Sequence, residues 1–226
     1  MKVKIYQIDE SLDRYETRFC CYDSVLKQAE RVDPSIYKTV YDGNVNVDKL
    51  ELIFLQCYME PPVGFLGRPM AMGDVIELED GTCHFCDFNG FKELKDFDTS
   101  KAAPIEGCRM LVLEPHKAPY ETTIPDDLEA LQRAVGGYIE ITYPFDDDAF
   151  LIGNEEAKLI GLEGNRRIGH SVYAGNLLVA ADDGEGGTKS LTDEQISKYT
   201  QMFQTPDDVT PEEVQGDMWF QFIGLG

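Results

Sequence analysis

The sequence is short of positive charge. Its 226 residues include 20 lysines and arginines against 42 aspartates and glutamates, and the formal net charge is −22. Proteins that bind nucleic acids directly gain much of their affinity by neutralising phosphates with lysine and arginine. The shortage of bases therefore predicts that this protein does not bind nucleic acid directly.

Long apolar runs are missing as well. No run approaches the roughly 20 residues that a membrane-spanning helix needs. Residues 1–9 alternate charged and apolar side chains and do not resemble a secretion signal. We therefore expect a cytoplasmic protein that makes no contact with a membrane. The hydrophobic fraction of 42% is ordinary for a globular chain and is enough to build a core.

The residue patterns of common enzyme sites are also absent. There is no glycine-rich phosphate loop, and the three histidines, His84, His116 and His170, have no spacing that links them. The run from Cys83 to Cys86 lacks the second cysteine or histidine pair that would complete a zinc site. The six cysteines match no small secreted disulfide framework. We therefore expect a protein without enzymatic activity, cofactor, zinc or structural disulfide.

Hydrophobic periodicity and turn residues predict both strands and helices in the first half of the chain. Apolar residues at three- and four-residue steps indicate helices, and Asp80-Gly81 between two alternating runs indicates a hairpin. The expected elements are a strand at 2–8, a helix at 23–31, a turn at Asp42-Gly43, a helix at 47–59 and strands at 75–78 and 82–88.

The second half shows the same mixture, with its densest run of β-forming residues between 136 and 166. The run 182–187 is too short for a twelve-residue calcium loop and is expected to be an exposed turn. After an acidic stretch without periodicity at 207–217, the apolar segment 218–223 is expected to pair with a sheet or dock on a partner. The other expected elements are strands at 109–113, 119–124, 138–145 and 150–152, a further candidate strand at 157–160, and helices at 125–135 and 193–203.

Periodicity stops between residues 96 and 107, where threonine, serine, alanine, proline and glycine collect. This stretch predicts a boundary between two domains, 1–98 and 104–226. Each domain is expected to be a small α+β unit, with a mostly antiparallel sheet and one or two packed helices. The predicted fold class of the whole chain is therefore α+β.

Several motifs in the first domain resemble the YodL-like domain of phage and conjugative-element proteins. They are IYQI at 5–8, GRPMAMGDVIEL at 67–78 and DFNGF at 87–91. The second domain resembles an uncharacterised domain family that often follows YodL-like domains in mobile-element proteins. Its motifs are MLVLEPHKAPYETTI, DLEALQRAVGGYIEITYPF, NEEAKLIGLEGNR and LTDEQISKYTQMFQTP. The resemblance implies a mobile genetic element as the source and brings no established catalytic residues.

The excess of acids is uneven: residues 1–103 hold 19 acids and 12 bases, whereas residues 104–226 hold 23 acids and 8 bases. The charge either keeps the protein soluble or attracts a basic surface of a host protein, for example to block a host defence. The residues expected to face such a partner are Asp146, Asp147, Asp148, Glu155 and Glu156.

The alternative function is that of a small-ligand or nucleotide-binding domain. Its polar contacts would come from Asn154, Asn165 and Arg166, because arginine is suited to an anionic group.

The predicted boundary can be tested by limited proteolysis. We expect the first cuts between residues 96 and 107, because exposed segments without regular structure are cleaved first. Mass spectrometry of the products identifies the cut sites. If fragments 1–98 and 104–226 each fail to give a protease-resistant core, the division into two folding units is wrong.

Overall fold

The computed structural model of the protein describes residues 1–223, and for residues 219–223 it describes the backbone alone. The chain divides into two compact units, Met1–Ile105 and Glu106–Gly226. Each unit combines antiparallel strands with helices, so the fold is α+β, as the sequence predicts.

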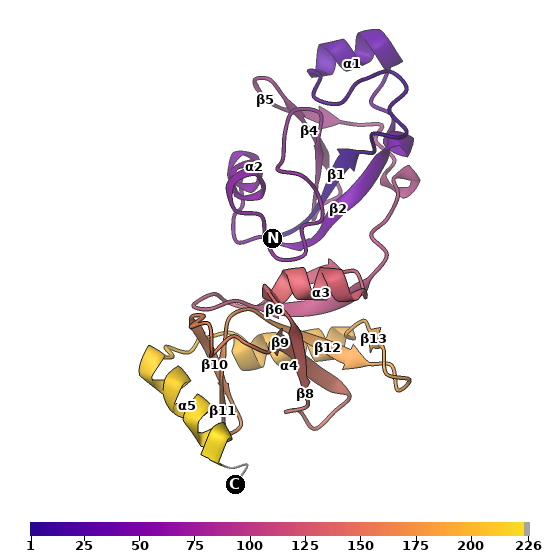
Figure 1. The fold of residues 1–226 in the computed structure, drawn as a ribbon. Helices are drawn as coiled ribbons and strands as arrows, with labels where there is room; N and C mark the ends of the chain where they lie inside the picture. Colours follow the sequence, from indigo (N-terminus) through magenta and orange to yellow (C-terminus); the bar gives the residue numbers. More distant parts are fainter. Residues whose placement is uncertain (224–226) are drawn as a thin grey trace. The chain divides into compact units, whose positions relative to one another are not determined.

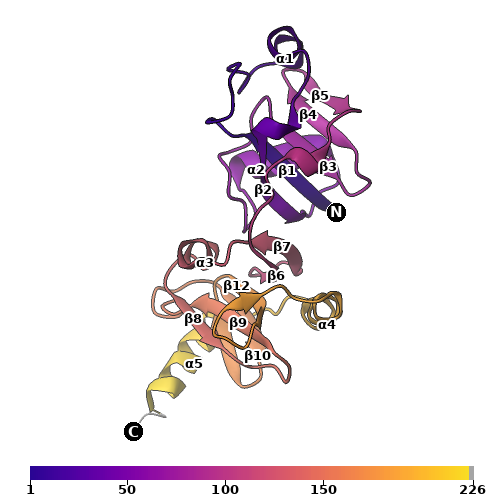
Figure 2. The same ribbon diagram turned by 90° about the vertical axis from the view of Figure 1, so that its right-hand side faces the viewer.

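The sheet of the first unit has the strand order β5-β4-β3-β1-β2, with antiparallel pairing throughout (Figure 1; β3 is labelled in Figure 2). The first strand of the chain therefore lies inside the sheet, between β3 and β2. The elements are β1 (Lys2–Ile8), α1 (Tyr22–Ala29), η1 (Pro34–Ile36), β2 (Tyr37–Asn44), α2 (Leu50–Met59), β3 (Val75–Leu78), β4 (Cys83–Asp87), β5 (Gly90–Leu94) and η2 (Thr99–Lys101).

A buried carboxylate fixes the loop before β3 to strand β1. Asp74 is fully buried, and the guanidinium of Arg68 donates to both of its oxygens, at 2.7 and 2.9 Å. The side chain of Gln7 and the backbone N–H of Ala71 donate to the same carboxylate. Burial raises the pKa of Asp74, and the hydrogen bonds from Arg68 oppose that rise. The run GRPMAMGD thus includes the residues that hold this loop in place.

The first unit extends past residue 98, the end that the sequence predicts. Ala103 exchanges backbone hydrogen bonds with strand β2, donating to the carbonyl of Tyr37 and accepting from the N–H of Thr39. Ala102 is part of the buried cluster on one face of this sheet, together with Tyr37 and Phe85. The segment between the two units is therefore shorter than the predicted window, and Ile105 is the last residue of the first unit.

The main sheet of the second unit has the strand order β7-β6-β12-β9-β8, and β13 pairs with β12. A separate two-stranded ribbon, β10-β11, packs against α5. The elements are β6 (Cys108–Leu113), β7 (Tyr120–Ile124), α3 (Leu128–Val135), β8 (Ile139–Thr142), β9 (Ala149–Asn154), β10 (Gly164–Ile168), β11 (Ser171–Ala174), β12 (Leu177–Asp182), β13 (Thr188–Lys189), α4 (Asp193–Phe203) and α5 (Pro211–Ile223).

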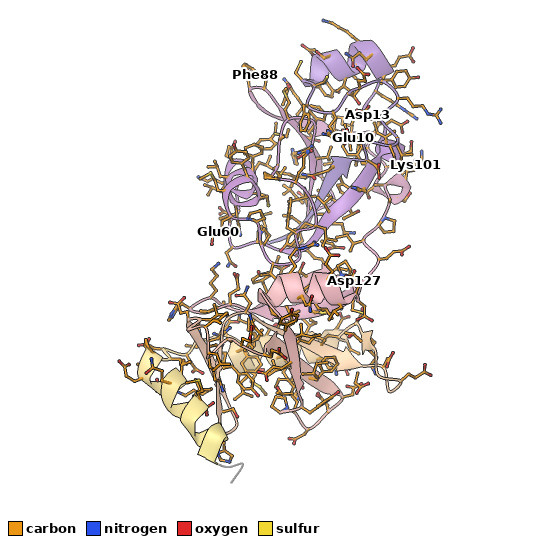
Figure 3. The ribbon with its side chains drawn as sticks, in the orientation of Figure 1. Glu10, Asp13, Glu60, Phe88, Lys101 and Asp127 are labelled. Carbon is orange, nitrogen blue, oxygen red and sulfur yellow. The ribbon has the colours of Figure 1, made fainter. Side chains whose placement is uncertain are left out.

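Of the two capped helices of this unit, α4 begins where the sequence predicts it, whereas α3 begins at Leu128 and not at Pro125, because Asp127 is its N-cap. The side chain of Asp127, labelled in Figure 3, accepts a hydrogen bond from the N–H of Ala130 at the start of α3. Thr192 and Gln195 form a reciprocal capping box at the start of α4. Helix α4, which Figure 2 shows nearly end-on, places Tyr199 and Phe203 in the core cluster of the main sheet.

Two short predictions are wrong. Asp42 and Gly43 lie within strand β2, because this stretch pairs with β1 and the carboxylate of Asp42 lies between two lysines of that strand. Residues 157–160 form a turn, because the side chain of Asn154 accepts from the N–H of Glu156 and reverses the chain directly after β9.

The prediction for the last residues is also wrong: 218–223 are helical and belong to α5, so they do not form a strand. Thr210 and Glu213 exchange side-chain-to-backbone hydrogen bonds around Pro211, which is a capping box at the start of the helix. The pattern Thr-Pro-Glu-Glu was visible in the sequence. The sequence also predicts that this segment docks on another surface. The side chains at 219–223, on which that docking depends, lie outside the part that the structure describes.

We predict that the cysteines react at very different rates. All six are free thiols. Burial raises the pKa of Cys57 and Cys86 to about 12, whereas hydrogen bonds from Ser24 lower the pKa of Cys21. Because the thiolate is the reactive form, iodoacetamide at pH 8 should modify Cys21 roughly tenfold faster than Cys57 or Cys86. Peptide mass spectrometry measures the rates, with urea-unfolded protein as the control. Equal rates in the folded protein would contradict the buried positions.

Candidate functional site

Strand β9 determines where the predicted site residues lie. It pairs with β12 in a register that sets Ala149 opposite Ala181, and the N–H of Asp182 donates to the carbonyl of Asp148 at 2.8 Å. The loop before β9 and the loop after β12 therefore meet at one end of the sheet. We call this place the acidic end, and it consists of Asp146, Asp147, Asp148, Asp182, Asp183 and Glu185.

Two of the three neighbouring aspartates at the acidic end hold the fold together. Asp147 accepts hydrogen bonds from the hydroxyl of Tyr199 at 2.5 Å, the ammonium of Lys198 at 2.8 Å and the N–H of Ala149. Asp148 pairs with Lys189 and accepts from Gln195, each at 2.7 Å. The β8–β9 loop is thereby bound to α4 and β13.

These contacts keep the acidic end ionised. Partial burial acts to raise the pKa of Asp147, but the hydrogen bonds from Lys198 and Tyr199 lower it overall. The ammonium of Lys189 lowers the pKa of Asp148, and backbone N–H groups of the 183–187 loop lower that of Asp183. Four of these aspartates, with Tyr143 and Lys189, line a shallow hollow. The hollow therefore carries negative charge at neutral pH.

Glu155 and Glu156 lie at the other end of β9. The strand has six residues between the two acidic groups, which corresponds to roughly 20 Å at about 3.3 Å per residue. Both glutamates are exposed. The five residues predicted to face a partner therefore do not form one patch, and the acids that join Asp146–Asp148 are those of the 182–187 turn.

Every lysine and arginine of the second unit is either paired with an acid of the same unit or buried. Seven of the eight lie within ion-pair distance of an acid, and the eighth, Arg166, is buried. The seven are Arg109, Lys117, Arg133, Lys158, Arg167, Lys189 and Lys198. The unit holds 23 acids, so many carboxylates remain after these pairs are formed.

Asn165 and Arg166 have structural roles. The amide of Asn165 donates to the carbonyls of Leu113 and Gly175, and its oxygen accepts from Arg166. The terminal nitrogens of Arg166 also donate to the carbonyls of Glu114 and Lys117, which holds the β6–β7 loop. Burial lowers the pKa of Arg166, and its Nε has no partner among the described residues. The polar groups of both side chains are therefore engaged mainly in hydrogen bonds to backbone carbonyls.

Asn154 borders a pocket that sequence reasoning missed. The cavity is about 250 Å³ and lies among β8, β9, β11, the 155–160 turn and α5. Its lining comprises Glu140, Gly153, Asn154, Glu155, Ala157, Lys158, Leu159, Tyr173, Ala174, Leu177 and Met218. These residues come from segments far apart in the sequence, so no local pattern identifies them. Of the three residues predicted for the alternative ligand site, Asn154 therefore lines a pocket, whereas Asn165 and Arg166 do not.

The described residues contain no group of three or more histidine, cysteine or acidic side chains placed to hold a metal ion. Cys83 and Cys86 are buried in strand β4, and His84 contacts the hydroxyl of Thr82. None of the helices within 1–223 is both long and apolar enough to span a bilayer.

Two family models match the chain. Residues 2–97 match the YodL-like domain, and residues 108–204 match the family described as Domain of unknown function (DUF3846). The order of the two domains is the one that the sequence motifs indicate. No curated protein and no solved structure matches the chain significantly.

We predict that Asp147 contributes to stability and Asp146 does not. Asp147→Ala leaves the buried hydroxyl of Tyr199 without its acceptor, which should lower the free energy of unfolding by about 1–3 kcal/mol. Asp146→Ala, the control, changes an exposed side chain and should stay within about 0.5 kcal/mol of the parent. Urea denaturation at pH 7 measures both.

The effect of Asp147→Ala should depend on pH. Because the pKa of Asp147 is lowered in the folded protein, its contribution is present above the pKa of an unfolded aspartate, about 3.9, and is lost as the pH falls through the folded value. The difference between parent and variant should therefore shrink below roughly pH 4. A variant as stable as the parent at pH 7 would contradict the structural role.

Proposed function

The chain joins a YodL-like domain to a domain of the DUF3846 family, and we propose that it is a non-enzymatic accessory protein that binds a basic surface of another protein. The acidic end of the second unit is the proposed contact. One observation carries this proposal: the lysines and arginines of the second unit are already paired with its own acids or buried. No further cation of the unit is therefore available to neutralise the ionised carboxylates around the hollow.

The shape of the acidic end supports a protein partner. Asp147 and Asp148 are held by α4 and β13, so the hollow is a fixed arrangement of charge. Fixed complementary charge raises association rates and excludes partners of the wrong sign. The hollow has four aspartates and one lysine in its lining, so a lysine or arginine of a basic protein would complement its excess of negative charge. The shortage of free bases in the same unit disfavours a phosphate backbone as the partner.

The biological setting of the proposal comes from the resemblance of both domains to proteins of phages and conjugative elements. In that setting the partner is a host protein, and binding would inhibit a defence system or change another host process. The net charge of the second unit is consistent with a domain that imitates nucleic acid toward such a partner.

A second candidate function is the binding of a small ligand in the pocket beside Asn154. The pocket itself favours this function, because a mostly apolar cavity with a few polar groups is the usual form of a ligand site. Its lining offers one lysine, Lys158, and that ammonium is paired with Asp217 at 2.5 Å. Arg166 does not line the pocket, so the geometry favours an uncharged or cationic ligand over a nucleotide.

The acidic-end proposal can be tested with a fluorescent lysine decapeptide as the basic probe. Asp146→Asn, Asp182→Asn and Glu185→Gln together remove three charges and leave the contacts of Asp147 and Asp148 intact. Three exposed ion pairs at roughly 0.2–1 kcal/mol each predict binding weaker by roughly threefold or more. The salt dependence of the affinity should also become less steep. Fluorescence anisotropy measures both quantities.

The matched control removes three exposed acids of the first unit, by Glu79→Gln, Glu93→Gln and Asp96→Asn. This triple variant has the same net charge as the first and should bind the probe nearly as well as the parent. An equal loss of affinity for the probe in the two triple variants would show that only the total charge matters. The proposal that the acidic end is a binding surface would then be wrong.

A further inference from the structure

The pocket beside Asn154 is lined by a glycine and a glutamate that face each other on neighbouring strands. β8 and β9 pair in a register that sets Glu140 opposite Gly153. Gly153 contributes no side chain, and a Cβ built there would lie 3.1 Å from a methyl group of Leu177. The side chain of Leu177 therefore packs against Gly153, and both residues line the pocket. The turn after β9 and the strand β11 supply the surrounding walls.

The walls of the pocket are mostly apolar. They include the side chains of Ala157, Leu159, Leu177 and Met218, together with Tyr173. The cavity of about 250 Å³ is larger than the engineered apolar cavity of ~150 Å³ that holds benzene. It has room for a linear chain of several carbon atoms.

The charged groups of the pocket are unequal in sign. The ammonium of Lys158 is paired with Asp217, and both side chains are largely buried. Glu140 and Glu155 remain, and Glu140 accepts no hydrogen bond or ion pair from any described residue. Glu140 lines the pocket but is exposed to solvent; the pocket walls still remove part of its water, which raises its pKa, while the charge of Lys158 opposes that rise. Among the described residues, no cation forms an ion pair with the carboxylate of Glu140, and the ammonium of Lys158 acts on it only from a distance.

We propose that this pocket binds a linear alkylammonium group, with the alkyl chain against Leu177 and Met218 and the ammonium against Glu140. The chemistry is shared by a free aliphatic amine and by the side chain of a lysine. The inference rests on the second candidate function, the ligand pocket, and is independent of the acidic end. An anionic ligand is disfavoured because the one cation of the pocket is already neutralised.

The test uses four probes on the full-length protein: hexylammonium, hexan-1-ol, hexanoate and Nα-acetyl-lysine methylamide. Two-dimensional ¹H–¹⁵N NMR follows the backbone signals of Gly153, Tyr173 and Met218. We expect hexylammonium to bind best, hexanol less well and hexanoate worst. Because an ion pair with an exposed carboxylate contributes about 0.2–1 kcal/mol, Glu140→Gln should weaken hexylammonium binding roughly two- to fivefold and leave hexanol binding unchanged.

Glu156→Gln is the matched control, because it removes one charge from an exposed neighbour that does not line the pocket. It should leave the binding of all four probes unchanged. Gly153→Ala narrows the cavity and should weaken hexylammonium and hexanol alike. Binding of the acetyl-lysine probe as tight as that of hexylammonium would assign the site to a lysine side chain, and weaker binding to a free amine.

The results separate the two levels of the inference. If hexanol and hexanoate bind as tightly as hexylammonium, or if Glu140→Gln has no effect, the alkylammonium assignment is wrong while the pocket remains a ligand site. If no probe shifts the signals of Gly153 and Tyr173, the pocket is not a ligand site and the second candidate function fails with it.

Discussion

The antiparallel pairing of β9 with β8 and β12 determines where the two proposed binding surfaces of the second unit lie. Its register with β12 brings Asp148 beside Asp182 and so joins two loops into the acidic end. Its register with β8 sets Gly153 opposite Glu140, and both residues line the pocket. Because side chains alternate between the faces of a sheet, a shift of either pairing by one residue would abolish the arrangement that depends on it.

The scarcity of bases gives the acids of this unit two different roles. Acids that meet one of the few lysines or arginines become fixed parts of the fold, as Asp147 does with Lys198 and Glu213 does with Arg167. The other acids stay on the surface and supply the negative field. Composition alone cannot separate the two groups, because the paired and unpaired acids are neighbours in the chain.

The sequence predicts the helices and strands best where local signals are strong. The cap at Thr192, the hairpin at Asp80-Gly81 and the α3 helix all lie where local chemistry places them. The predictions fail where the structure of a segment depends on pairing with a distant strand, as for Asp42-Gly43 within β2. They also fail where a helix cap was overlooked in the sequence, as for the residues after Thr210 in α5. The pocket beside Asn154 is harder to predict than the helices and strands, because Glu140, Tyr173 and Met218 come together only after folding. Arg166 looked like an anion ligand because sequence cannot show that backbone carbonyls occupy it.

The division of the acids into structural and surface groups is tested most directly by a titration of the carboxyl groups, observed by ¹³C NMR. The account predicts Asp147 and Asp148 below the ordinary aspartate pKa of about 3.9, and Glu140 above the ordinary glutamate pKa of about 4.3. Ordinary values for all three groups would contradict the account, because the contacts around β9 could not then exist as described.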